Sequence, residues 1–241
     1  IRDRPDPVLN VQLPAEIETT KSVLDKIKQG RLGKTYQNII YVGQSYGSIL
    51  GHGFAVKYPN VVNAIILNGW SNAATKSAIP TFTNLNFLPA RDVNRTRFGS
   101  LPPGYLASST PSGFQKMDYY HGDNNSHYDQ GLARRQESSL GTVTVGELYT
   151  SSLNTVPASG YKGHVLLITG EYDNWFCARD YVFLDGHCGW GSSSIPAKAN
   201  AAFPNANFSY HIVPNTGHVV QFHYTQQDTY GRSVAWIEKV L

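Results

Sequence analysis

A serine lies between two glycines in the stretch Gly-Gln-Ser-Tyr-Gly, residues 43–47, just after an apolar run. Residues 38–42 are predicted to form a short buried strand, and the residues that follow Ser45 are predicted to form a helix that ends before Pro59. Such a serine is either a polar residue of a tight turn or a nucleophile of the G-x-S-x-G type, for which small residues at both glycine positions allow a sharp turn. The helix directs its positive end toward the site, so the N–H of Tyr46 is predicted to bind an oxyanion.

A serine nucleophile needs a base, and His218 is the best placed of the eight histidines. It follows the predicted strand 208–213 on a short loop, at the end of the strand where parallel sheets carry their functional groups. The other histidines lie within predicted strands or helices, in the polar stretch 72–161, or beside a cysteine; they are His52, His121, His127, His164, His187, His211 and His223. Of these, His223 is expected inside the final helix.

The acid that orients the histidine is predicted to be Asp173. This residue lies four positions after Thr169, at the end of another apolar run, in the stretch LLITGEYDNWF. Glu171 is the rival because it lies closer to the strand, while Asp180 and Asp185 lie further along the chain. The order serine, aspartate, histidine is that of the α/β-hydrolase arrangement and differs from the orders of two other serine hydrolase folds.

The elements that must position these residues follow from four short apolar runs, which are predicted strands at 38–42, 61–67, 165–169 and 208–213. Because helical segments separate them, they indicate an α/β fold with a mostly parallel sheet flanked by helices. One helix is predicted to begin at Pro14 and to end at Gly30. A last helix is predicted from Val219 to the end of the chain, with an apolar stripe at Tyr230, Val234, Ile237 and Leu241.

Between the second and third predicted strands lies a stretch rich in Asn, Ser, Thr, Pro and Tyr, and a bare loop of that length is improbable in a compact domain. Residues 72–161 are therefore predicted to form an inserted, mainly helical cap, with helices near 128–139 and 145–153. Residues 1–71 and 162–241 are predicted to form the core that carries the three chemical groups.

The bulk composition narrows the classes of function. The net charge is +3, but the basic residues are scattered, which disfavours nucleic-acid binding. No apolar run approaches the roughly 20 residues of a membrane span. Neither a metal nor an organic cofactor is expected, because Cys and His lack ligand spacing and no further phosphate-binding glycine loop occurs.

The two cysteines, Cys177 and Cys188, are predicted to form a disulfide, although a pair of buried thiols is the alternative. The sequons at Asn94, Asn124 and Asn207 are candidate glycosylation sites, but a chain this rich in Asn, Ser and Thr contains sequons by chance. Together with the low proportion of charged residues, these features favour a secreted protein.

Three stretches carry a resemblance to a known family: IIYVGQSYGS around Ser45, LLITGEYDNWFC around Asp173 and VPNTGHVVQFH around His218. Over essentially its whole length the chain resembles the α/β-hydrolase superfamily, in particular secreted fungal serine hydrolases with a helical cap. The resemblance implies that the serine attacks an acyl carbon, the histidine moves the proton and the aspartate orients the imidazole. Gln44 stands where many relatives carry histidine, at a variable position of the motif.

The resemblance covers only the later strands of that family's sheet. The strand at 38–42 would then be an open apolar edge, which is an aggregation hazard. An N-terminal fragment of the same protein, as a second chain or a further segment, is therefore expected as a partner and as the source of the second oxyanion donor.

A serine at this position favours acyl transfer, so hydrolysis of a small carboxylic ester is the expected reaction. Gln44, Trp175 and Val219 are predicted to line the substrate pocket, although plain core packing explains Trp175 and Val219 equally well. Three alternatives stay open: a peptidase or amidase of the same fold, a lyase that uses the same groups for proton transfer, and a binding protein without catalysis.

Overall fold

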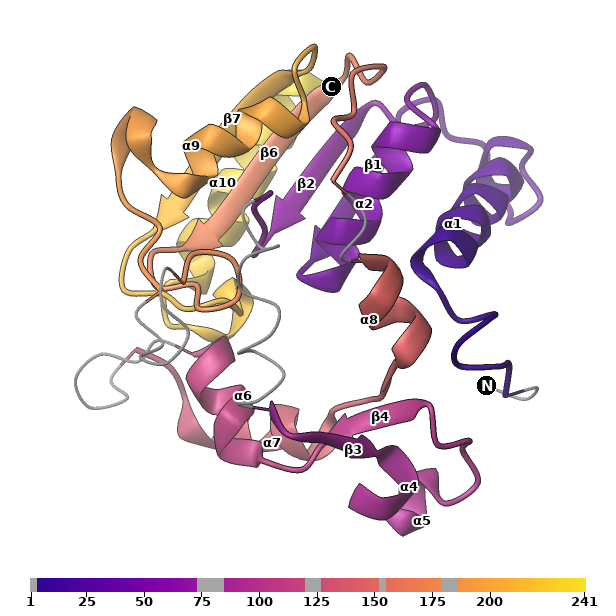
Figure 1. The fold of residues 1–241 in the computed structure, drawn as a ribbon. Helices are drawn as coiled ribbons and strands as arrows, with labels where there is room; N and C mark the ends of the chain where they lie inside the picture. Colours follow the sequence, from indigo (N-terminus) through magenta and orange to yellow (C-terminus); the bar gives the residue numbers. More distant parts are fainter. Residues whose placement is uncertain (1–3, 73–84, 120–126, 152–154, 179–185) are drawn as a thin grey trace.

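A computed structural model of the chain describes residues 4–72, 85–119, 127–151, 155–178 and 186–241. Its centre is a four-stranded sheet in the order β1-β2-β6-β7, and every neighbouring pair is parallel. The four strands lie side by side in Figure 1, and their bounds are Ile40–Gln44 for β1, Ala64–Asn68 for β2, His164–Gly170 for β6 and Asn207–Val213 for β7. The predicted parallel sheet is confirmed, with β1 displaced by two residues from its predicted bounds.

The two central strands explain the continuous apolar runs. All residues of β2 except Asn68 are buried, and so are all residues of β6 except His164. The register pairs Leu67 of β2 with Leu167 of β6, and both side chains are fully buried. The edge strand β1 is more open, because the side chain of Val42 is 59% exposed.

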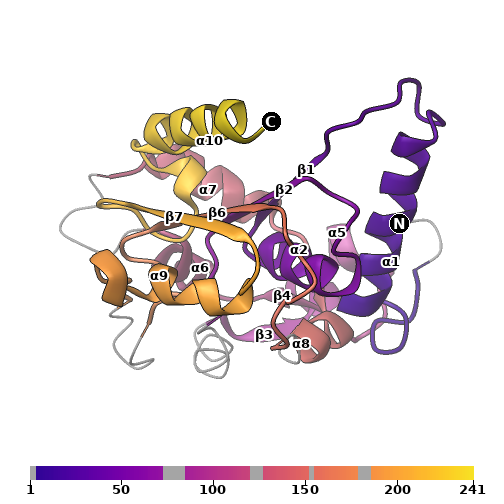
Figure 2. The ribbon, with the colours of Figure 1, turned by 90° about the horizontal axis from the view of Figure 1, so that it is seen from above.

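Helices cover both faces of the sheet, as Figure 2 shows from above. On one face lies α10, Gln226–Val240, whose Trp236 and Ile237 pack against Ile66 of β2 and neighbouring buried residues. The opposite face carries three helices, which are α1 at Leu13–Lys28, α2 at Tyr46–Lys57 and α9 at Ile195–Lys198.

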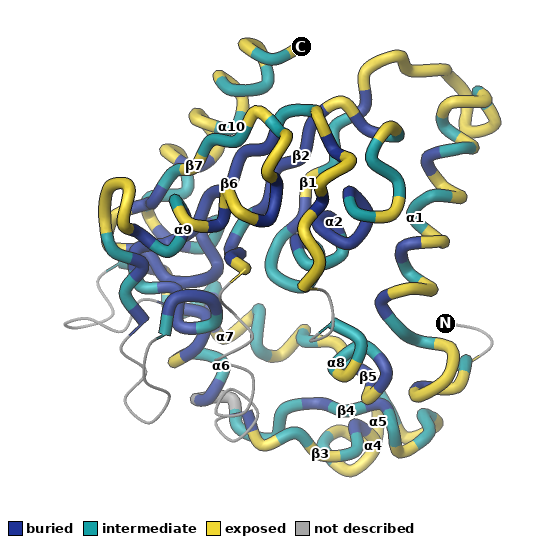
Figure 3. The backbone as a smooth tube through the Cα atoms, turned by 45° about the horizontal axis from the view of Figure 1, so that its top comes forward, coloured by how far each residue is buried: buried dark blue, intermediate teal, exposed yellow. Residues whose placement is uncertain are grey.

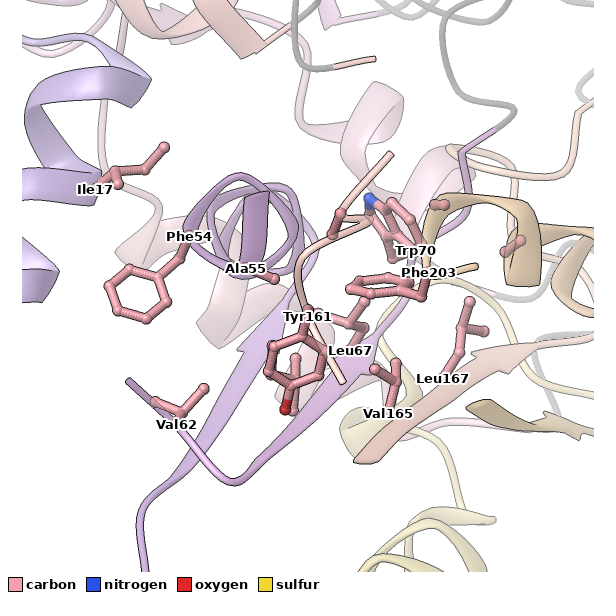
Figure 4. Close-up of a cluster of buried hydrophobic side chains, with 14 of the residues drawn as sticks. Ile17, Phe54, Ala55, Val62, Leu67, Trp70, Tyr161, Val165, Leu167 and Phe203 are labelled. Carbon is pink, nitrogen blue, oxygen red and sulfur yellow. The ribbon is translucent and has the colours of Figure 1, made fainter. Parts of the chain in front are cut away.

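The larger core cluster lies between that second group of helices and the sheet. Figure 4 shows its side chains, among them Phe54 from α2, Leu67 from β2, and Trp70 beside Phe203. The rings of Trp70 and Phe203 meet edge to face at 6.0 Å. In Figure 3 the buried residues concentrate along the sheet strands and α2, while many residues of the outer helices α1 and α10 are exposed, so the core is built around the elements that carry the predicted site.

The insertion lies beyond the C-terminal ends of the sheet strands (Figure 1). It contains α7 and α8 close to the predicted bounds, but also an antiparallel sheet of three strands that the sequence analysis did not predict. The strands are β3 Phe87–Pro89, β4 Tyr105–Ser108 and β5 Val143–Thr144, and the helices are α4 Ala90–Val93, α5 Arg95–Phe98, α6 Pro111–Asp118, α7 Gln130–Ser139 and α8 Val145–Ser151. Strands this short carry too few alternations to be recognised from periodicity.

The final helix begins later than predicted. A 3-10 turn spans Val220–Phe222, and α10 starts only at Gln226, so the expectation that His223 lies within a helix was wrong. The cause is tertiary pairing: His223 forms a β-bridge with Tyr128, and the N–H of Tyr224 donates to the carbonyl oxygen of His127 at 2.9 Å.

The predicted apolar stripe of this helix is also largely wrong. Ile237 packs against the sheet, but Tyr230, Val234 and Leu241 are each at least half exposed. Trp236 takes the place on the buried face that the stripe assigned to them. Within the described ranges, no helix has both the length and the apolar composition that crossing a membrane requires.

Candidate active site

Ser45 occupies the sharp turn between β1 and α2. Its backbone has φ 56° and ψ −116°, a left-handed conformation that a non-glycine residue rarely adopts. Its N–H donates to the carbonyl oxygen of Asn68 on the neighbouring strand at 2.9 Å, which holds the turn in place. A strained serine at the end of a strand and the start of a helix has the backbone geometry of a nucleophile elbow.

The need for glycine at this turn applies to one of the two positions. A Cβ on Gly43 would lie 2.4 Å from the carbonyl oxygen of Gly47, where backbone leaves no room. A Cβ on Gly47 would meet no described atom within 4 Å, so the expectation that position 47 also requires a small residue was wrong.

His218 and Asp173 form a buried pair. Nδ1 of His218 lies 3.0 Å from Oδ2 of Asp173, and the two side chains are 2% and 0% exposed. The carboxylate is held by three further donors: the Thr169 hydroxyl at 2.7 Å on Oδ2, and the N–H groups of Trp175 at 2.9 Å and Phe176 at 3.0 Å on Oδ1. With Nδ1 directed at Asp173, the other ring nitrogen of His218 is left to exchange a proton.

Two opposing effects set the proton affinity of His218. Burial lowers the pKa of the imidazole, but the charge of Asp173, its hydrogen bond and the charge of Asp118 raise it, and the net result is a raised pKa. The ring of Phe176 stacks on the imidazole at 5.6 Å and helps to fix its orientation.

The turn after β2 lies between the serine and the histidine, which both lie at the C-terminal ends of the strands. Gly69 has φ +54°, and a Cβ there would lie 2.6 Å from Nε2 of Gln44 and 2.9 Å from Cε1 and Nδ1 of His218. Nε2 of Gln44 donates to the carbonyl oxygen of His218 at 3.1 Å, so the residue before Ser45 is tied to the histidine loop. Among the described residues no hydrogen bond joins the Ser45 hydroxyl to His218, a bond that in free hydrolases is often long or poorly aligned.

Tyr46, the predicted oxyanion donor, is the first residue of α2. Its hydroxyl donates to Oε2 of Glu16 in α1. Burial raises the pKa of Glu16 to about 7, the Tyr46 hydrogen bond opposes this rise, and the charge and side chain of Glu147 add to it. A carboxyl group that changes its charge near neutral pH therefore lies one helix away from the nucleophile.

The rival acid takes part in a different set of contacts. Oε1 of Glu171 lies 3.1 Å from Nε2 of His187, and Oε2 accepts a hydrogen bond from the N–H of Asn215 at 3.0 Å. These contacts hold the loop after β7 to the loop that contains the cysteines. The other candidates named from the sequence, Asp180, Asp185 and His121, lie outside the described residues.

His223 has a role that the sequence analysis missed. Its Nε2 accepts from the N–H of Gly217 at 3.0 Å, and its Nδ1 donates to the carbonyl oxygen of Val219 at 3.0 Å, so it binds the backbone on both sides of His218. Burial lowers its pKa to about 4, so the ring is neutral at physiological pH and keeps this donor and acceptor pattern. Nothing in its sequence position signals a contact that arises only when the loop folds back.

The predicted pocket residues surround the histidine in different ways. The ring of Trp175 lies 5.7 Å from that of His218, and Val219 is buried in a cluster with Tyr119 and Tyr128 of the insertion. Two described cavities lie elsewhere, and none of their lining residues belongs to the predicted site. One of about 640 Å³ lies between β7 and α10 beside Trp190, and one of about 410 Å³ lies at the opposite end of the strands, beside Pro59.

Cys177 and Cys188 form a disulfide, with an S–S distance of 2.04 Å. Both residues are buried, and the N–H of Cys177 donates to the carbonyl oxygen of Asp173 at 2.9 Å, so the bridge adjoins the turn that holds the acid. Across the described part of the chain, no group of three or more His, Cys, Asp or Glu side chains has the arrangement of a metal site.

Two of the three candidate glycosylation sites lie in described segments. The side chain of Asn94 caps α5 by accepting from the N–H of Arg97 at 3.0 Å, and Asn207 is exposed at the start of β7. Asn124 lies outside the described residues.

Neither a protein-family model nor a curated protein matches the sequence. Solved structures do resemble it. A monoacylglycerol lipase of Paleococcus ferrophilus superposes with a TM-score of 0.61 at 13% identity, covering 96% of this chain and 77% of the lipase.

Two further structures resemble the chain to a similar degree. A carboxylesterase of the thaumarchaeon Nitrososphaera gargenis gives a TM-score of 0.58 at 16% identity, with 98% of this chain and 74% of the esterase covered. A mutant of tomato methylketone synthase I gives 0.59 at 13% identity, with 98% of this chain and 83% of the synthase covered. The parallel sheet, the helices on both faces and these superpositions agree: the chain has the α/β-hydrolase fold.

Proposed function

We propose that the chain is a serine hydrolase of carboxylic esters, with Ser45 as nucleophile, His218 as base and Asp173 as the residue that orients it. The observation that carries this proposal is the buried His218–Asp173 pair, with Nδ1 and Oδ2 3.0 Å apart. It lies at the same C-terminal ends of the parallel strands as Ser45, whose φ is 56°. A folded core does not need a buried histidine and aspartate for its stability. Acyl transfer, in contrast, needs a base that an acid holds in place.

In the proposed reaction the hydroxyl oxygen of Ser45 attacks the acyl carbon while the unprotonated ring nitrogen of His218 takes the hydroxyl proton. The tetrahedral oxyanion is bound by the N–H of Tyr46 and by a second donor. Collapse of this intermediate breaks the ester bond, and the alcohol leaves with the proton from His218. Water then repeats the same steps on the acyl-serine and releases the carboxylic acid.

The similar structures support hydrolysis without deciding the bond that is cleaved. Among them are proteins described as carboxylesterases, a lipase and a serine hydrolase of carbazole degradation, but also a methylketone synthase and a bromoperoxidase. One fold hosts many chemistries, so the proposal depends on the site. The competing functions are amide hydrolysis, a lyase reaction and ligand binding without turnover.

The test is labelling with a fluorophosphonate, followed by mass mapping of the modified peptide. We expect the label on Ser45 and its loss in the His218→Ala variant, with a panel of ester and amide substrates then separating esterase from peptidase. A lyase would be labelled as well but would release no carboxylic acid from any ester. Folded protein that is not labelled would overturn the proposal and leave binding without catalysis.

We also propose that an additional extended segment of the same protein pairs with the outer edge of β1. In the described sheet β1 pairs with β2 alone, and Val42 on this edge is 59% exposed. An apolar strand edge is normally covered, and a neighbouring segment would be positioned to supply the second oxyanion donor. Mass spectrometry of the intact, active protein tests this, since a labelled species of 26.6 kDa alone would contradict it.

We further propose that the protein is secreted and carries glycans at Asn94, Asn124 or Asn207. The disulfide supports an oxidising compartment, and Asn207 is exposed. A shift in mass after treatment with a peptide N-glycosidase, for protein isolated from its natural source, is the expected result. An unchanged mass would leave these asparagines unmodified.

A further inference from the structure

Asp118 is a buried carboxylate that the proposed reaction does not use. It is the last residue of α6 in the insertion, and it is 5% exposed. Burying a carboxylate is unfavourable unless hydrogen bonds or charges compensate for the lost water, so its partners indicate what it does.

Both oxygens of the Asp118 side chain accept hydrogen bonds. Nε1 of Trp175 donates to Oδ1 at 2.8 Å, and Nε2 of Gln136 in α7 donates to Oδ2 at 3.1 Å. Trp175 is two residues after Asp173, and its ring lies 5.7 Å from the ring of His218. The carboxylate therefore fixes an indole that packs beside the imidazole.

The backbone around Asp118 binds the loops on both sides of the pair. The carbonyl oxygen of Asp118 accepts from the N–H of Val219 at 3.0 Å, directly after His218. The carbonyl oxygen of Lys116 accepts from Nδ2 of Asn174 at 2.7 Å, directly after Asp173. The end of α6 thus connects the insertion to the acid turn and to the histidine loop together.

We propose that Asp118 is a positioning residue for His218: its carboxylate holds Trp175 against the imidazole and supplies a second negative charge that stabilises the imidazolium. This inference rests on the proposed function, because it assigns a role to His218 as the base. Asp118 acts through Trp175 and through its charge, and it does not touch the reacting atoms.

The charged and titratable groups around the imidazole agree with this role. Asp173 is hydrogen-bonded to it from the acid turn, and the charge of Asp118 acts on it from the end of α6. His223, which the charge of His127 in the insertion also affects, is held neutral on the histidine loop. The pKa of Asp118 is raised overall, because burial raises it more than the positive charge of His218 and the hydrogen bonds from Trp175 and Gln136 lower it, and the charge of Asp173 adds to the rise. The proton affinities of the two groups are therefore linked, and losing the Asp118 charge lowers that of His218.

The experiment is the rate of fluorophosphonate labelling as a function of pH, in wild-type protein and in Asp118→Asn. The substitution keeps an oxygen that accepts from Trp175 and removes the charge. Because only neutral His218 can activate Ser45, we expect the acidic limb of the profile to move to lower pH by about 0.5 to 1 unit, with little change on the plateau. Asp92→Asn, which removes an exposed carboxylate of the same insertion, is the matched control and is expected to leave the profile in place.

The outcomes separate the two proposals. If wild-type protein is not labelled, the proposed function fails first. If wild-type protein is labelled and the pH profile of Asp118→Asn superimposes on the wild-type profile, or moves to higher pH, the role of Asp118 is refuted.

Should Asp118→Asn not fold, Gln136→Met is the second variant. It removes one hydrogen-bond donor from the Asp118 carboxylate and makes that carboxylate harder to ionise. We then expect a smaller shift in the same direction, and an unchanged limb counts against the proposal.

Discussion

At Asp173 a single carboxylate accepts four hydrogen bonds, three from its own turn and strand and one from His218. Replacing it by asparagine keeps the size but removes the charge and favours the wrong tautomer of the imidazole. We expect Asp173→Asn to lower the rate of labelling and of hydrolysis by about a thousandfold or more.

Glu171→Gln is the matched variant for that prediction, because Glu171 lies two residues earlier and binds His187 and Asn215 instead. It is expected to keep activity within a few-fold of wild type. Comparable losses in the two variants would mean that the acid has been assigned wrongly.

Glu16 gives the protein a pH-dependent stability. Its pKa is raised from 4.5 to about 7 in the folded chain, so between these values the folded state binds a proton that the unfolded state has released. The free energy of unfolding must therefore fall as the pH rises from about 4.5 to 7. In Glu16→Gln this fall is absent, while the amide still accepts from Tyr46.

We expect Glu16→Gln to gain stability relative to wild type between pH 5 and pH 8, by on the order of 1 kcal/mol after allowance for solvent screening of this partly exposed group. Denaturant unfolding at both pH values measures the gain. A constant difference between the two proteins across this range would contradict the prediction.

At the scale of elements, the turn after β2 decides whether the histidine fits beside the serine. Gly69→Ala places a methyl group 2.9 Å from Nδ1 and Cε1 of His218 and 2.6 Å from Nε2 of Gln44. We expect the labelling rate to fall at least tenfold, because the imidazole must move away from Asp173. Gly191→Ala is the control: it has a similar φ of +66° but no described atom within 4 Å of its Cβ, so it carries the backbone strain without the displacement.

The disulfide stabilises the loop that begins at the acid turn. Its cysteines are 11 residues apart, and closing a loop of that size in the unfolded chain is worth about 2–3 kcal/mol. We therefore expect Cys177→Ala/Cys188→Ala to unfold at lower denaturant concentration than wild type. Reductant should lower the wild-type midpoint to that of the double variant and leave the variant unchanged; a wild-type midpoint insensitive to reductant would argue against the bridge in solution.

At the scale of the whole molecule, the sheet and the positions of the three candidate catalytic residues were predictable because they depend on local patterns. Four apolar runs mark the four strands, and Ser45, Asp173 and His218 all follow strand ends, where a parallel sheet collects its loops. The positions of β2, β6 and β7 followed within a few residues, and the disulfide was predicted from the spacing of the two cysteines together with the hints of secretion.

The contacts made by the insertion could not be predicted. Asp118 and His223 have no distinctive neighbours in the sequence. The contact of Asp118 with Trp175 and the bridge of His223 to Tyr128 form only when residues far apart in the chain fold together. The late start of α10 has the same origin, because the bridge from His223 to Tyr128 competes with helix formation. Tertiary contacts determine these partners and the start of α10, and the pattern of polar and apolar residues does not predict them.

The open edge of β1 leads to a prediction for the chain studied alone. A lysine on an edge strand opposes pairing with another strand, so Val42→Lys is expected to reduce self-association measured by light scattering. Val234→Lys removes a valine that is similarly exposed, at 54%, but on the helix α10. If both variants reduce association equally, general hydrophobicity and not the strand edge is responsible.

Strands β2 and β6 pair directly although residues 69–163 separate them in the sequence. The whole insertion is therefore one loop that connects two adjacent strands. The entropic cost of closing a loop grows only with the logarithm of its length. Closing this loop therefore costs about 2 kcal/mol more free energy than closing a connection of roughly ten residues. Insertions of quite different size and shape are thus compatible with the same sheet. Evolution can therefore exchange the insertion while the strands that precede Ser45, Asp173 and His218 remain as they are.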